Sequence, residues 1–124
     1  MTKDRALFDW FQQFGMPFYP VTALPPAKEI TFPYGTYEPV FGYNGDITYP
    51  TVNIYYLTES EVIPNKKAAE IGDVIGMGGT LVKCDEGLMW IKRGSPFVQG
   101  INDPDNSNIK RRLISIAIEF LTTN

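Results

Sequence analysis

The C-terminal part of the chain reads Ile109-Lys-Arg-Arg-Leu-Ile-Ser-Ile-Ala-Ile-Glu-Phe-Leu121. Its large apolar residues recur at every second position, at Ile114, Ile116, Ile118 and Phe120. A period of two predicts a β-strand with one buried face, because successive side chains of a strand point to opposite sides of the sheet. The predicted strand has about a dozen residues, whereas most strands have about five or six. We therefore expect it to outrun a small sheet and to offer an end or an edge to a neighbouring molecule.

A hairpin is predicted directly before this last strand. Residues 80–84 and 88–92 are two apolar-rich runs, and Asp85-Glu86-Gly87 between them suits a tight turn. Residues 94–108 are interpreted as a polar connection from the hairpin to the last strand.

Two helices are predicted from apolar residues at helical spacing. The first spans residues 3–14, with Thr2 as its N-terminal cap and Gly15 at its end. The second spans residues 64–75 and ends at Gly76-Met-Gly-Gly79. The expected buried stripes are Leu7, Trp10, Phe11 and Phe14 in the first helix and Ala68, Ile71, Val74 and Ile75 in the second.

Two more strands are predicted in the first half of the chain. Residues 51–57 place Val52, Ile54 and Tyr56 on one face. Residues 30–37 also have strand character, but Pro33 has no amide hydrogen to donate, which suggests an edge position.

These elements predict one α+β domain that spans residues 1–124. A chain of this length supports a single hydrophobic core. The expected sheet is mixed and mainly antiparallel, with about five strands. Along the chain, the expected order is helix, strand, strand, helix, and then three strands.

The segment of residues 38–50 is predicted to be a protruding arm or a long ordered loop. Its centre contains Asn44-Gly45, which is a strong signal for a tight hairpin turn. Phe41, Tyr43 and Tyr49 flank this turn. Because aromatic side chains bury much area with little loss of entropy, we interpret these three residues as a candidate interface with another subunit or with a tube.

The composition argues against the common kinds of reactive centre. The chain has no histidine and a single cysteine, Cys84, so Ser–His, Cys–His and ordinary zinc sites are not expected. We predict no catalytic residue, no metal site and no cofactor. The 17 aromatic residues, from Phe 8, Tyr 7 and Trp 2, exceed the needs of one small core and favour contacts with partners.

Basic residues are concentrated in the second half of a chain whose net charge is −3. Five of the eight basic residues there are bunched, namely Lys92, Arg93, Lys110, Arg111 and Arg112, and we expect these five at one end of the sheet. Alternation sends Lys110 and Arg112 to one face and Arg111 to the other. Two interpretations stay open, namely solvated charges at a strand end and a contact with acidic partner subunits or with DNA phosphates.

Several longer stretches resemble one group of bacteriophage proteins. They are Phe14-Gly-Met-Pro-Phe-Tyr19, Thr31-Phe-Pro-Tyr-Gly-Thr-Tyr37, Met89-Trp-Ile-Lys-Arg-Gly-Ser-Pro-Phe-Val-Gln99 and Asp105-Asn-Ser-Asn-Ile-Lys-Arg-Arg112, followed by the last strand. In these stretches and in the order of its elements, the chain resembles the tail terminators of long-tailed bacteriophages, also described as tail completion or minor capsid proteins. The resemblance covers nearly the whole chain and includes no catalytic signature.

This resemblance implies a structural role in the virion, at the neck end of the tail, for a protein made in the host cytoplasm. Six copies would form a ring that caps the tail tube and receives the head-side connector. Further implied partners are genome DNA, which would pass through the hole without sequence-specific binding, and the tail sheath protein in a contractile tail. No membrane partner and no enzymatic activity are implied.

Two other classes of protein remain as alternatives. A head-to-tail connector or stopper of the neck would have a similar size and setting, and it would bind the portal-side ring rather than the tail tube. A small hydrolase would need a carboxylate pair such as Asp85 and Glu86 in a pocket, but these residues lie at a predicted hairpin turn. The acidic composition disfavours a free nucleic-acid binder.

Overall fold

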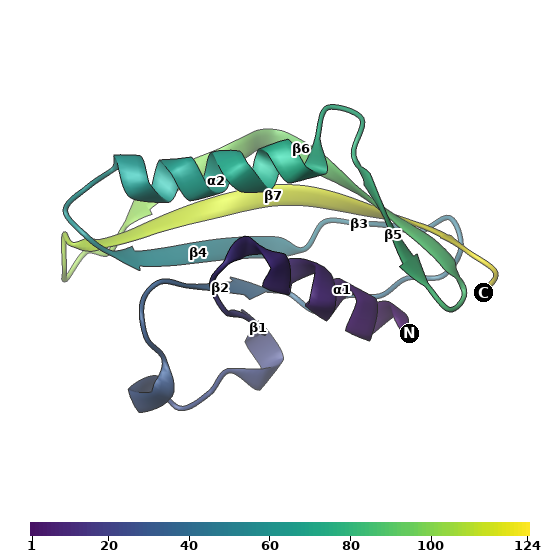
Figure 1. Ribbon diagram of the computed structural model, residues 1–124, viewed down its shortest axis with the longest axis horizontal. Coiled ribbons are helices and arrows are strands. Elements are labelled where there is room, and N and C mark those ends of the chain that lie inside the picture. The colour runs from purple at the N-terminus through teal and green to yellow at the C-terminus, as the bar shows by residue number, and fades with distance from the viewer.

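The computed structural model describes residues 1–124 as one domain with two layers (Figure 1). A seven-stranded sheet forms one layer, with the strand order β1-β2-β4-β7-β6-β5 and with β3 paired to β7. The helices are α1 (Lys3–Phe11) and α2 (Val62–Ile75), and the strands are β1 (Phe18–Pro20), β2 (Tyr34–Tyr37), β3 (Ile47–Thr48), β4 (Thr51–Leu57), β5 (Thr80–Cys84), β6 (Gly87–Asn102) and β7 (Ile109–Thr122). Only β1 and β2 pair in parallel. The predicted α+β fold is confirmed.

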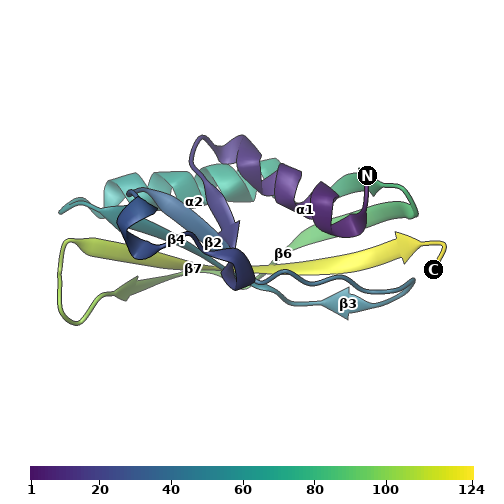
Figure 2. The ribbon, with the colours of Figure 1, turned by 90° about the horizontal axis from the view of Figure 1, so that it is seen from below.

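Both helices cover the same face of the sheet, and no helix covers the other face (Figure 2). The core lies between the helices and the sheet. On β7, Ile114, Ile116, Ile118 and Phe120 point into it and are at most 2% exposed, which confirms the predicted alternation. The aromatic side chains of Phe11, Phe14 and Phe18 pack against one another in the same core.

Helix α1 agrees with its sequence signals. The Thr2 side chain accepts a hydrogen bond from the Arg5 amide, as an N-terminal cap does. A 3₁₀ turn, Gln12–Phe14, continues the helix, and Gly15 then adopts a φ of 76°, which favours glycine.

Helix α2 begins at Val62, two residues before the predicted start. Its buried residues are Pro64, Ala68, Ile71, Gly72 and Ile75, whereas Val74 is 40% exposed. The prediction that Val74 belongs to the buried stripe is therefore wrong. The reason is a close contact at Gly72, where an added Cβ would lie 2.9 Å from the Phe97 ring of β6. This contact turns the Gly72 side of the helix toward the sheet.

Strand β7 occupies the centre of the sheet. Strand β6 pairs with it on one side, and β4 and β3 pair with it on the other. The expectation that the last strand offers a free edge is thus wrong, because other strands of the same chain satisfy its backbone groups. The open edge belongs instead to β6, which β5 covers only from Gly87 to Ile91.

Strand β6 is much longer than predicted. It has 16 residues and continues to Asn102, through most of the segment expected to be a polar connection. Its register with β7 shifts between Arg93 and Val98, so that residues 94–97 bulge opposite Ser115. Gly94 permits the bulge, since an added Cβ would lie 2.8 Å from the Ser115 Cβ. Glycine and proline residues within this run interrupt the alternation of apolar and polar side chains, so the sequence pattern did not predict a strand here.

Strand β2 begins just after Pro33 and has neighbours on both sides, so the edge position suggested for residues 30–37 is wrong. The edge is formed by β1, which has only three residues. Such short strands lack enough positions to show a period.

The segment of residues 38–50 is an ordered loop that lies along β7. Strand β3 pairs Ile47 with Glu119, and the Gly45 amide donates to the Phe120 carbonyl. Lys3 of α1 holds the loop from the other side, because its buried ammonium donates to the Gly42 carbonyl at 2.8 Å. The segment is thus held by contacts with both β7 and α1.

Candidate interaction surface

The face of the sheet without helices carries a row of aromatic side chains. Tyr34 of β2 stacks on Tyr55 of β4, with ring centroids 4.7 Å apart and an interplanar angle of 13°. Tyr19 of β1 lies 6.5 Å from Tyr34 on one side, and Phe32 lies 5.6 Å from it. The row therefore crosses three neighbouring strands. Burial raises the pKa of Tyr34, and Tyr55 adds to the rise, so the Tyr34 hydroxyl keeps its proton at neutral pH.

Arg111 of β7 extends this row. Its register partners are Tyr55 on β4 and Ile101 on β6. The Arg111 Nε–H donates to the Asn53 Oδ1 at 2.9 Å, and its two Nη atoms have no acceptor within the chain. A cavity of about 250 Å³ lies here, lined by Arg111, both tyrosines and apolar residues that include Ile101 and Ile109. The sequence analysis missed this site, because it is assembled from four separate segments.

The basic residues at the start of β7 have two different environments. Lys110 and Arg112 lie on the helix face and are buried. Arg112 pairs with the Glu61 carboxylate and donates to the Asn65 Oδ1 at 2.8 Å, and the Lys110 ammonium lies 3.6 Å from the Glu61 carboxylate. Both interpretations of these two cations, solvated charges or contacts with partners, are therefore wrong for Lys110 and Arg112. They form an ion-pair network inside the chain.

The other predicted basic residues do not join a single cluster. Lys92 pairs with Ala117 and Arg93 with Ile116, near the middle of β7 rather than at its start. The Lys92 ammonium lies 3.0 Å from the Glu119 carboxylate and 4.0 Å from the centre of the Trp90 ring. Arg93 is exposed and forms no ion pair. The expectation of one basic end of the sheet is wrong, because the bulge and the antiparallel register separate these residues along β7.

The Glu61 network predicts a pH-dependent stability. The hydrogen bond from Arg112 lowers the pKa of Glu61 below its ordinary 4.5, and the charges of Arg112 and Lys110 lower it further. A lowered pKa stabilises the fold above the unfolded value, and this contribution is lost as the pH falls through the folded value. We expect Glu61→Gln to lower the melting temperature at pH 7, and we expect this difference to shrink as the pH falls below the ordinary pKa of Glu61. Thermal unfolding between pH 7 and pH 2.5 measures both.

Glu59→Gln is the matched control, since Glu59 is a nearby exposed carboxylate that forms no ion pair. A melting-temperature difference for Glu61→Gln that is the same at every pH would contradict the assignment.

The predicted interface aromatics are all on the surface. Phe41 and Tyr43 are each 62% exposed, and Tyr49 is 75% exposed. Phe41 borders a cavity of about 180 Å³ with Leu7 and Tyr37, whereas Tyr49 borders a different cavity, of about 320 Å³, beside the bulge of β6. The structure thus presents them as two separate sites rather than one patch.

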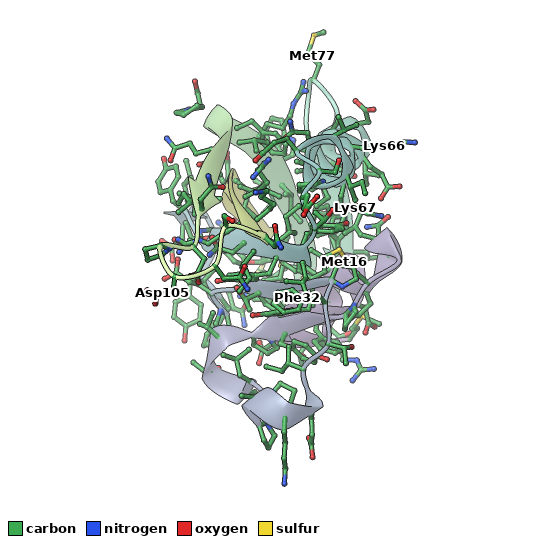
Figure 3. All side chains as sticks on the ribbon, turned by 90° about the vertical axis from the view of Figure 1, so that its left-hand side faces the viewer. Met16, Phe32, Lys66, Lys67, Met77 and Asp105 are labelled. Carbon is green, nitrogen blue, oxygen red and sulfur yellow. The ribbon has the colours of Figure 1, made fainter.

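Met77 is the most exposed large apolar residue, at 96%. It lies in the turn between α2 and β5 and projects from the molecule (Figure 3). The turn is well held, because the Trp90 indole N–H donates to the Gly78 carbonyl at 2.9 Å and the Gly76 amide donates to the Gly72 carbonyl. The sequence interpretation treated Gly76–Gly79 only as the end of a helix. A methionine between glycines was the signal that it overlooked.

The largest cavity, of about 780 Å³, is a groove along α2. Val62, Ile63 and Val74 give it apolar walls, and Lys66 and Asp73 are among its charged residues. No group of three or more histidine, cysteine, aspartate or glutamate side chains is placed to hold a metal ion, and Cys84 is buried. Neither helix has the length and apolarity to cross a membrane.

Comparison with known proteins identifies no relative of this chain: no protein-family model, no curated protein and no solved structure matches it.

Proposed function

We propose that this chain is a structural virion protein that caps a bacteriophage tail tube as a hexameric ring and joins the tube to the head-side connector. The observation that carries the proposal is the number of large apolar side chains exposed on well-held backbone, among them Met77, Phe41, Tyr43 and Tyr49. Scattered apolar residues are ordinary on a monomer, but exposed aromatics and methionine are enriched where proteins assemble.

The placement of these residues favours a ring. Phe41 and Tyr43 belong to the loop beside the C-terminal end of β7, and Met77 belongs to the turn after α2. Two different patches on one subunit suit head-to-tail contacts, which close into a ring when the rotation per subunit permits it. The helix-free face of the sheet supplies a third surface for the tube or for the connector. The role is structural, and DNA passes through the ring without sequence-specific binding.

The proposal is tested by imaging the full chain with the tail tube protein of the same phage. We expect sixfold rings at one end of the tubes in electron micrographs, and a mass of six subunits by native mass spectrometry. A chain that leaves tube ends bare but binds the portal-side ring alone would be a connector or stopper, and the proposal would be wrong. A single copy or an open filament at the tube end would also contradict it.

The double variant Phe41→Ser/Tyr43→Ser tests the predicted interface within the same experiment. Both side chains are mostly exposed, so we expect the melting temperature to change little while the fraction of capped tubes falls about tenfold or more. Leu24→Ser is the matched control, because it removes an exposed apolar side chain from the segment between β1 and β2. Unfolding of the double variant would show that these rings belong to the core.

A further inference from the structure

Arg111 is a partly buried cation whose charge the chain does not neutralise. Its only side-chain hydrogen bond goes from Nε to Asn53, and it forms no ion pair. Asp103 lines the same cavity, but its Oδ1 accepts from the amides of Asp105 and Asn106 at 2.8 and 3.1 Å. Asp103 is thus hydrogen-bonded to the β6–β7 turn through Oδ1 and forms no ion pair with Arg111. The Nη atoms remain available to an acceptor from outside.

The walls of the cavity suit an apolar or aromatic group next to that acceptor. Tyr34, Tyr55 and Phe32 contribute rings, and Ile101 and Ile109 contribute aliphatic surface. The volume of about 250 Å³ is below the roughly 300–1,000 Å³ of small-molecule pockets, so it suits one or two side chains inserted by a partner protein. Arginine and tyrosine together are typical of the residues that dominate the energy of protein interfaces.

We propose that this cavity, which we call the Arg111 cavity, binds a carboxylate side chain of a partner protein, together with an apolar neighbour of that side chain. The planar guanidinium matches a carboxylate with two parallel hydrogen bonds, and the partial shielding from water strengthens them. The inference rests on the proposed function for the setting of the contact, since it names the chemistry of a partner of the ring.

DNA fits the Arg111 cavity less well than an acidic protein segment. A phosphate backbone is bound by several cations in a row, and its affinity grows with the number of phosphates neutralised. Here Arg111 is alone, because Lys92 on the same face is already paired with Glu119. The chain as a whole also has a net charge of −3, which disfavours a long polyanion more than a single carboxylate.

The test is an NMR titration of the ¹⁵N-labelled full chain with phenylacetate, which combines a carboxylate with a ring. We expect saturable shifts of the Arg111 Nε–H signal and of the Tyr55 and Ile101 amides. Phenylacetamide, the neutral isostere, should bind about tenfold more weakly or worse, because charged hydrogen bonds contribute more than neutral ones. Equal binding of the two compounds would overturn the proposal.

Two variants distinguish binding of phenylacetate at the Arg111 cavity from non-specific attraction between charges. Arg111→Gln should weaken phenylacetate binding about tenfold or more. Lys92→Gln removes the same charge from the same face and should change binding less than about twofold, because Lys92 is outside the cavity. An equal loss in both variants would show non-specific attraction and overturn the proposal.

Ile101→Glu provides a test that keeps Arg111 in place. Residue 101 lies directly opposite Arg111 on β6. A glutamate at position 101 would therefore form an ion pair with the Arg111 guanidinium and abolish phenylacetate binding. Unchanged binding would place the ligand elsewhere.

Tighter, Arg111-dependent binding of phenyl phosphate and of a twelve-nucleotide oligothymidylate would assign the cavity to DNA instead. Rings that form on tubes without any binding at the Arg111 cavity would refute only this inference, and binding without rings would refute only the proposed function.

Discussion

Arg112→Glu is expected to lower the free energy of unfolding by about 3–5 kcal/mol, because it puts an unpaired carboxylate at a buried position next to the Glu61 carboxylate. The Arg112 side chain is only 4% exposed and pairs with Glu61. A glutamate at this position would face the Glu61 carboxylate under α2 and would also lose the hydrogen bond to Asn65. At this chain length, the change corresponds to a fall in melting temperature on the order of 10 °C or more.

Arg111→Glu is the matched control for this prediction. It makes the same charge reversal one residue away, on the face without helices, where the side chain is only partly buried. We expect it to cost less than about 1.5 kcal/mol, since it loses one hydrogen bond to Asn53. Urea unfolding followed by the fluorescence of Trp10 and Trp90 measures both variants. Similar losses for the two would show that Arg112 is not the buried partner of Glu61.

Gly35→Ala is the second change with a large expected effect. Gly35 of β2 is paired with Phe18 of β1, and the Phe18 ring lies across it. An added Cβ would lie 2.2 Å from the Phe18 Cε2, in a site where both residues are buried. We expect a loss of about 3 kcal/mol, at the upper end for overpacking in a core, together with displacement of β1 from the sheet.

Two further variants identify the cause of that loss. Gly78→Ala has open space around the new methyl group and should change stability by less than about 1 kcal/mol. Phe18→Leu combined with Gly35→Ala should cost less than the sum of the two single changes, because the smaller side chain makes room for the methyl group. Strict additivity, measured by the same urea unfolding, would mean that the clash with Phe18 is not the reason.

Periodicity predicted the elements that are long enough to show it. The last strand, the strand of residues 51–57, the hairpin at Gly87 and both helices are present, because an amphipathic period records which side of a local element is buried. The two-residue β3 and the three-residue β1 are too short to carry a period. The second half of β6 was missed because Gly94 and Pro96 interrupt the pattern where the strand bulges.

The candidate site was predictable only in part. The exposure of Phe41, Tyr43 and Tyr49 followed from their place around a tight turn. The Arg111 cavity did not follow from any pattern, since Tyr34, Tyr55 and Ile101 come from three strands that meet only through register. The ion pairs of Glu61 could not be predicted either, because nothing near Glu61 in the sequence indicates that its partners are two buried cations 49 and 51 positions later.

The sequence by itself determined the class of fold and the separation of neighbouring side chains on β7 onto opposite faces, because both depend on the local geometry of the backbone. The tertiary structure alone decided what each of these two faces packs against. Arg112 is buried against Glu61 because α2 packs over that face, whereas Arg111 faces an open cavity because no helix covers the other one. It also decided that β7 is the central strand, since strand order depends on contacts between segments far apart in the chain.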